Sequence, residues 1–85
     1  MMVLVSAPNG SQTTRIGLVV GARIGSAVVR NRVKRLLREA VRVHLDDLEP
    51  GVDIVLIARP EAANARLRDV SLALDNLLRR GGLLS

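Results

Sequence analysis

Residues 30–42, with the sequence RNRVKRLLREAVR, constrain the fold of this chain more than any other stretch. On a helix that turns about 100° per residue, they separate into an apolar arc and an opposite polar face. The arc, extended by the flanking residues, holds Val29, Val33, Leu36, Leu37, Ala40, Val43 and His44. The polar face holds Asn31, Lys34, Arg35, Arg38 and Arg42, with Arg32 at its edge. Other elements must cover the apolar arc, so we expect a packed domain around this helix.

The polar face of this helix is strongly cationic. Six of the chain's thirteen Lys and Arg residues lie within residues 30–42, and Glu39 is the one carboxylate among them. Positions 31, 35, 38 and 42 recur at helical spacing and form one continuous ridge. Solvated faces normally mix the two charge signs, so this ridge is better explained by an anionic partner. Arginine, which outnumbers lysine twelve to one in the chain, binds phosphate bidentately and stacks on bases.

Composition narrows the possible partners. The chain has 85 residues, which make one small domain, and its net charge of +5 favours polyanions. The absence of cysteine fits a reducing compartment. No apolar run reaches the roughly 18 residues of a membrane span, and residues 1–8 lack the features of a signal peptide. The chain contains no Phe, Trp or Tyr, so bound bases cannot stack on aromatic rings.

Hydrophobic patterning predicts a strand beginning at residues 3–5, a strand over 15–20, a helix over 27–48, a strand over 52–58 and a helix over 64–80. The turn residues 8–11 would join the first two strands as an antiparallel pair, and Ser26 would cap the first helix. This order predicts an α+β fold, a two-layer α-β sandwich with both helices on one face of a small mixed sheet. The other face would expose Val3, Val5 and Val19, either as a binding surface or because part of the fold is absent.

A search for catalytic groups finds none that convinces. His44 lies on the apolar arc with no Ser or Cys partner, so we expect a partly buried structural histidine. The carboxylates Asp46, Asp47, Glu49 and Asp53 lack the spacing of a metal site and are expected to be solvated. The first three would lie at the end of the helix, where the macrodipole disfavours them. Gly21, Arg23 and Gly25 form at best a weak phosphate loop, and close packing explains the glycines equally well.

Three runs of sequence carry a family resemblance. Residues 15–18 (RIGL), 23–28 (RIGSAV) and 30–39 (RNRVKRLLRE) closely resemble bacterial ribonuclease P protein. Residues 53–60 (DIVLIARP) and the closing amphipathic helix are also similar to that family. The resemblance extends from about residue 3 to residue 78.

The resemblance implies that catalysis belongs to an RNA subunit. The protein would be a monomer, one per RNA, that binds ribonuclease P RNA and precursor tRNA in the cytoplasm and assists removal of the 5′ leader. It would contribute no catalytic residue and bind no cofactor or metal itself, while the ribonucleoprotein would need Mg²⁺. The residues that match the RNA-contacting motif are Arg23, Arg30, Asn31, Arg32, Lys34, Arg35 and Arg38, and Arg42, the last residue of the cationic ridge, completes the predicted RNA-binding set. The implied fold is ribosomal protein S5 domain 2-like, with a left-handed crossover where the general default is right-handed.

The chain departs from the family pattern in three ways. The helix and strand that usually open the family are missing before Met1, so we expect an N-terminally short version, through truncation, a misassigned start or natural variation. Ala22 stands where the family commonly has lysine, and Val3 and Val5 stand where aromatic residues usually line the leader cleft. With Val19, these valines are the predicted leader-cleft residues. Docking to the RNA subunit should therefore survive better than leader binding.

Three other functions were weighed. A general RNA-binding module, associated with the ribosome and without a role in tRNA maturation, is the main alternative. A membrane-surface protein could use a basic amphipathic helix, but this helix lacks Trp and Phe anchors. A stand-alone protein nuclease is disfavoured by the lack of a catalytic constellation.

Overall fold

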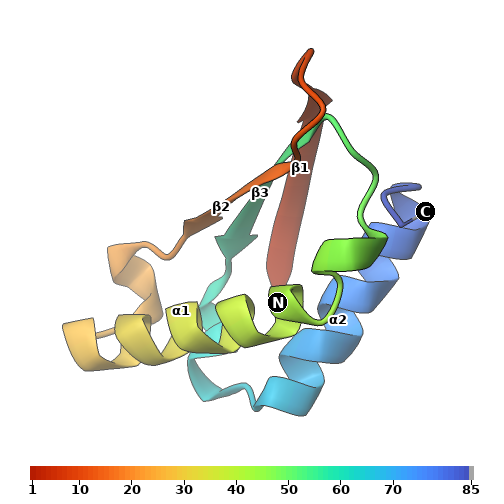
Figure 1. Ribbon diagram of the computed structural model, residues 1–85. Helices are drawn as coiled ribbons and strands as arrows, with labels where there is room; N and C mark the ends of the chain where they lie inside the picture. The colour runs from red at the N-terminus through yellow and green to blue at the C-terminus, as the bar shows by residue number, and fades with distance from the viewer. Residues whose placement is uncertain (85) are drawn as a thin grey trace.

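The computed structural model describes residues 1–84, which form three strands, two α-helices and three short 3₁₀ helices. Figure 1 shows their arrangement in space. The elements in chain order are β1 (Met2–Pro8), β2 (Arg15–Val19), η1 (Ala22–Ile24), α1 (Ala27–Arg42), η2 (Leu45–Asp47), β3 (Val52–Ala58), η3 (Pro60–Asn64) and α2 (Leu67–Arg80). The predicted order of strands and helices and the α+β class are confirmed.

The sheet has the strand order β1-β3-β2, so the last strand in sequence lies at the centre. It runs antiparallel to β1 and parallel to β2. Val55 of β3 has Val5 as its neighbour on one side and Gly17 on the other. The predicted pairing of the first two strands is therefore wrong. A central strand is covered by strands on both sides and by helices, which favours the more continuously apolar β3 over its two neighbours.

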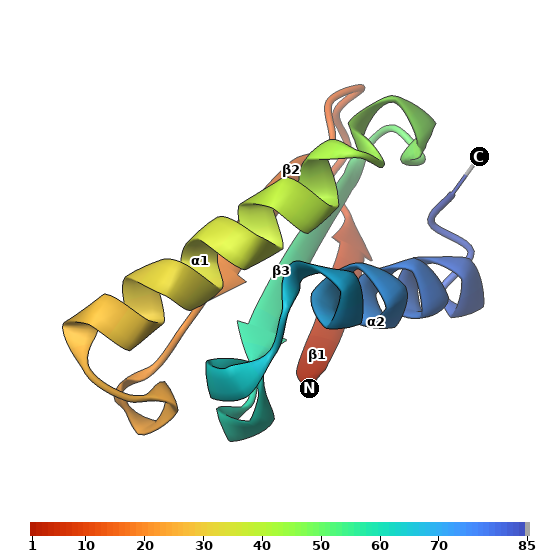
Figure 2. The same cartoon turned by 90° about the horizontal axis from the view of Figure 1, so that it is seen from below.

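Both helices cover the same face of the sheet (Figure 2). Their apolar faces meet alternate residues of β3, which point to that side. The buried residues of this layer are Val33, Leu37 and Ala40 of α1, Ile54, Leu56 and Ala58 of β3, and Val70, Leu74 and Leu78 of α2. The amphipathic pattern of the two helices thus places their cationic and polar faces on the outside of the domain.

Helix α1 begins where the sequence predicts and ends earlier. The Ser26 side chain accepts a hydrogen bond from the Val29 N–H at 3.4 Å, which confirms the cap. The helix stops at Arg42, and Val43, assigned to the apolar arc, is 75% exposed. The chain turns through η2 because residue 48 pairs with the C-terminal segment, where the Glu49 N–H donates to the Leu83 carbonyl at 2.8 Å. Because the helix ends at Arg42, this arginine lies in the last turn, where the helix dipole favours a positive charge.

Helix α2 begins at Leu67, three residues later than predicted, because η3 occupies residues 60–64. The Arg66 N–H donates to the Asp69 carboxylate at 3.0 Å and satisfies one of the free groups at the helix start. At the other end, Gly82 has a φ of +66°, the left-handed conformation that glycine commonly adopts just after a helix. Leu67, the first residue of the helix, is 43% exposed and contributes little to the core.

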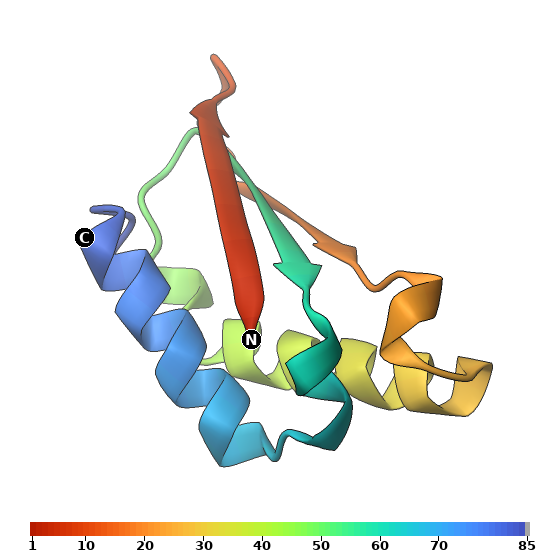
Figure 3. The same cartoon turned by 180° about the vertical axis from the view of Figure 1, so that it is seen from behind.

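The second face of the sheet carries exposed apolar side chains. Val3, Val5 and Val19 are 38%, 52% and 47% exposed. In the view from behind, β1 is the strand nearest the viewer, and α1 lies below the sheet (Figure 3). The predicted open apolar face is therefore confirmed for these three residues. Among residues 1–84, no helix is both long enough and apolar enough to span a bilayer.

Candidate nucleic-acid interface

The structure brings the predicted ridge together on one side of α1. The side chains of Asn31, Arg35, Arg38 and Arg42 are exposed, and that of Lys34 is half-buried beside them. The opposite side of the helix holds the buried Val33 and Leu37, which fix the rotation of the helix on the sheet. The cations are thus presented outward by a helix that the core holds in place.

Few carboxylates neutralise this face. Glu39 pairs with Arg42, whose Nη2 lies 2.7 Å from the carboxylate oxygen. Within the described residues, none of the salt bridges involves Lys34, Arg35 or Arg38. An exposed pair between Arg42 and Glu39 stabilises by at most about 1 kcal/mol, so an incoming phosphate can compete for the arginine. The face keeps a strong positive potential.

Arg32 has a second task that the sequence did not reveal. Its Nη1 donates to the Ala63 carbonyl at 2.7 Å and its Nη2 donates to the Ala65 carbonyl at 2.6 Å. These carbonyls belong to η3 and the residue that ends it, so the guanidinium ties α1 to the segment before α2. A guanidinium has five N–H donors, so these two bonds use only part of the hydrogen-bonding capacity of Arg32. In the sequence, the position of Arg32 at the edge of the polar face was the one feature that pointed to a role in packing.

Arg30 and Arg23 flank the start of the helix. Arg30 is half-buried, and its Nε is buried without a hydrogen-bond partner. Arg23 is exposed in η1. Gly25 has a φ of +148°, and a Cβ there would lie 3.2 Å from two atoms of Val29. Gly25 thus allows Val29 to pack closely against the loop. This agrees with the packing role that the sequence offered as the alternative to a phosphate loop.

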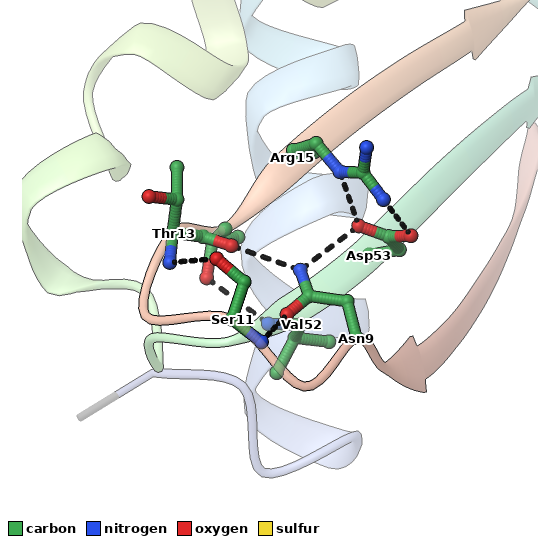
Figure 4. Close-up of polar contacts among 7 residues, drawn as sticks. Asn9, Ser11, Thr13, Arg15, Val52 and Asp53 are labelled. Carbon is green, nitrogen blue, oxygen red and sulfur yellow. Dashed lines mark hydrogen bonds and ion pairs between the residues drawn. The ribbon is translucent and has the colours of Figure 1, made fainter.

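Asp53 is not simply solvated, contrary to the prediction. It accepts hydrogen bonds from Arg15 Nε at 2.9 Å, Arg15 Nη2 at 2.8 Å and Asn9 Nδ2 at 3.0 Å (Figure 4). These bonds, with Arg15 as the main cause, hold the pKa of the Asp53 carboxyl below its ordinary value. The cluster joins the turn after β1 to β2 and β3, which assigns it a structural role at one end of the sheet.

His44 has the predicted partly buried position, with a side chain that is 15% exposed. Its Nε2 lies 3.8 Å from an Asp75 carboxylate oxygen, and Arg79 donates to that carboxylate at 2.9 Å. The hydrogen bond from Arg79 is the main cause that lowers the pKa of Asp75. In residues 1–84, no group of three or more His, Cys, Asp or Glu side chains is placed to hold a metal ion.

A groove of about 520 Å³ lies between β2 and the second half of α1. The strand side contributes Thr14, Ile16 and Leu18, and the helix side contributes Lys34, Arg38, Val41 and Arg42, with Leu45 from η2. This groove was not predicted from the sequence. The alternating apolar residues Ile16 and Leu18 of β2 indicated that this strand has one buried side. The incorrect prediction that β2 pairs with β1 gave no basis for placing these residues opposite α1.

Comparisons with known proteins agree with this geometry. The sequence model of the family described as Ribonuclease P matches residues 1–82. The ribonuclease P protein component of Clostridioides difficile is 39% identical over 80 residues, which cover 93% of this chain and 70% of that protein. The corresponding protein of Roseiflexus castenholzii is 41% identical over 85 residues, with 99% and 70% covered.

Solved structures give the same result. The RNase P protein of Staphylococcus aureus superposes with a TM-score of 0.88 at 28% identity, covering 99% of this chain and 77% of that one. The RNase P protein of Thermotoga maritima gives a TM-score of 0.82 at 34% identity, with 93% and 76% covered. The chain is thus shorter than these relatives but matches them nearly throughout its length. Family model, sequence relatives and fold together show that this chain belongs to the bacterial ribonuclease P protein family.

Proposed function

We infer that this chain is the protein subunit of ribonuclease P, which binds the catalytic RNA and assists removal of the 5′ leader from precursor tRNA. The carrying observation is the cationic face of α1, where Lys34, Arg35 and Arg38 have no carboxylate partner among the described residues. Arginine suits this role, because its planar fork binds two phosphate oxygens at once. The hydrolytic chemistry then lies on the RNA subunit, and the protein supplies binding and orientation.

The proposed RNA-binding residues are Arg23, Arg30, Asn31, Arg32, Lys34, Arg35, Arg38 and Arg42. Support comes from their placement on η1 and on the outer side of α1, and from the match of this stretch to the family motif. Arg32 combines two roles in this proposal, because two of its donors hold η3 while the others face the RNA. The orphaned Nε of Arg30 makes this side chain a candidate for a phosphate oxygen as well.

The leader cleft is proposed on the open face of the sheet. Val3, Val5 and Val19 form an apolar surface there, which can contact the sugar and base edges of an extended strand. We further propose that residues 1–85 act as one RNA-binding domain, one monomer per RNA, in the cytoplasm. The ribonucleoprotein would require Mg²⁺ held mainly by RNA phosphates. For the crossover from β2 through α1 to β3, we propose the left-handed form of the ribosomal protein S5 domain 2-like fold.

Reconstitution of precursor cleavage tests this function. A bacterial ribonuclease P RNA would be assayed at low magnesium, with and without the protein. We expect the protein to increase cleavage, because added cations reduce the repulsion between the two RNAs. No gain over the RNA alone would reject the assignment. A general RNA-binding module would instead bind unrelated duplexes as tightly as the ribonuclease P RNA, so a competition assay separates the two functions.

Single-residue variants test the interface. Arg35→Ala should weaken RNA binding and reduce the slope of log K against log salt by about one unit for a lost phosphate contact. Arg80→Ala is a matched control, since it removes another exposed arginine, from the last turn of α2. Equal slopes for Arg35→Ala and Arg80→Ala would remove the ridge from the interface.

A further inference from the structure

The groove between β2 and α1 has two chemically different sides. Ile16 and Leu18 of the strand, together with Val41 and Leu45, provide an apolar floor. On the helix side, three cations line it, and no carboxylate does. The last of these cations is Arg42, the one already paired with Glu39. The groove therefore suits a molecule that is flat and apolar on one side and anionic on the other.

The size of the groove also limits its occupant. Its volume of about 520 Å³ falls in the range of roughly 300–1,000 Å³ that is typical of pockets for small organic molecules. A helix of three turns, about 16 Å long and 10–12 Å across, is much larger and would use only part of its length there. One nucleotide fits better, because its base is flat and its phosphate is anionic.

We propose that this groove receives one unstacked nucleotide of the catalytic RNA, with the base on the apolar floor and its phosphate against Lys34 and Arg38. This proposal rests on the proposed function and adds a single base contact to it. The catalytic RNA is the favoured source because the groove is continuous with the cationic face of α1, two of whose ridge residues line it. RNA recognition commonly uses such splayed bases from loops and bulges.

The chain has a particular need for such a groove. It has no aromatic residue on which a base could stack. An aliphatic floor next to guanidinium groups can replace a ring, since both surfaces exclude water from the face of the base. Thr14 lies at one end of the groove, but its hydroxyl donates to the Glu49 carbonyl and accepts from the Val52 N–H, the latter at 3.4 Å. The polar selectivity of the site therefore rests on its cations.

Leu45→Ser tests the apolar floor without disturbing the core, because this side chain is 54% exposed. Val43→Ser is the matched control, since Val43 is 75% exposed, lies two residues away and does not line the groove. We expect Leu45→Ser to weaken binding of ribonuclease P RNA about fivefold, at the low end of the range for one base contact. The salt slope should stay unchanged, because no phosphate contact is lost. Arg38→Gln should lower both the affinity and the slope.

A direct probe uses the absence of aromatic residues. Leu45→Trp places the only fluorophore of the chain at the groove, so its emission has no protein background. Adenosine monophosphate should quench this emission saturably, and Arg38→Gln should weaken the effect. Inorganic phosphate at the same concentration should not quench it, since it brings charge without a base. Val43→Trp provides the control that reports quenching outside the groove.

The outcomes separate this proposal from the proposed function. If the unmodified protein binds and activates the RNA while Leu45→Ser behaves like Val43→Ser, the groove proposal fails alone. If the unmodified protein neither binds nor activates, the function fails first. If Leu45→Ser weakened only the binding of precursor tRNA, the catalytic RNA would not be the source of the nucleotide in the groove. Tighter binding of an acidic amphipathic peptide than of adenosine monophosphate would overturn the nucleotide as the occupant.

Discussion

Removing the Arg32 side chain should destabilise the protein as well as weaken its RNA binding. The guanidinium donates to two carbonyls, Ala63 at 2.7 Å and Ala65 at 2.6 Å. Hydrogen bonds to a charged group stabilise by about 1.5–3 kcal/mol each. Both are only part-buried, and water can replace some of the lost bonding. We therefore expect Arg32→Ala to lower the free energy of unfolding by about 2–3 kcal/mol, from the lower end of that range.

The expected change is large for a domain of this size. A loss of 1 kcal/mol lowers the melting temperature of a small domain by about 4–8 °C, so Arg32→Ala should lower it by about 10–20 °C. Far-ultraviolet circular dichroism is the suitable measurement, because the chain has no aromatic residue for fluorescence. Arg32→Lys should recover about half of the loss, since an ammonium is a compact donor and cannot span both carbonyls as the planar fork does.

Arg35→Ala is the matched control for this reasoning. Arg35 lies three residues further along the same helix, is exposed and has no carboxylate partner among the described residues. Its removal should change the free energy of unfolding by less than about 0.5 kcal/mol. Melting temperatures of the two variants within about 3 °C of each other at matched salt would contradict a stabilising role for Arg32, since the loss of one such hydrogen bond alone exceeds that difference.

Four further variants have defined expectations. Gly51→Ala should destabilise by about 2 kcal/mol or more, because φ is +75° and a Cβ would lie 2.5 Å from the Ser11 carbonyl oxygen. Gly10→Ala, at φ +71° with nothing within 4 Å, should cost only about 1 kcal/mol in urea unfolding, and equal costs would contradict the clash. Because the pKa of Asp53 is lowered in the folded protein, its carboxylate contributes stability above the ordinary carboxyl pKa, and this stability is lost as the pH falls through the lowered pKa. Asp53→Asn should therefore reduce the fall in melting temperature on acidification. An unchanged fall would contradict this role of Asp53. Val5→Ser should leave the melting temperature nearly unchanged, since the side chain is 52% exposed. It should weaken the binding of precursor tRNA more than the binding of mature tRNA. Equal losses of affinity for the two tRNAs would show that Val5 does not belong to the leader cleft.

Local patterns predicted the elements well. The strand over residues 52–58 has the predicted bounds, because a continuous apolar run between Gly51 and Pro60 leaves little choice. The first helix begins one residue after Ser26, whose side chain caps it. Both features depend on neighbours within a few residues, and the exposure of the cationic face follows directly from the helical period. The ridge could therefore be predicted, although its contacts with RNA stay a prediction.

Features that depend on distant segments were missed. The turn at residues 8–11 suggests a hairpin, yet the Asn9 N–H donates to the Gly51 carbonyl at 2.9 Å and so joins the turn to the start of β3. The end of α1 depends on residues 48 and 49 pairing with the C-terminal segment. The carbonyls that hold Arg32 lie thirty-one and thirty-three residues away in sequence. No local pattern encodes such a partner, because any exposed carbonyl could in principle accept.

The central position of β3 governs when the sheet can form during synthesis. Neither β1 nor β2 has a strand partner until residues 52–58 have left the ribosome, since both pair with β3 alone. By the time residue 52 emerges, more than half of the chain has been made and it carries two unsatisfied strands and a highly charged helix. Closing such distant pairs is slow compared with hairpin formation. A nascent chain arrested before residue 52 should thus remain sensitive to protease, while one that has released α2 as well should become resistant.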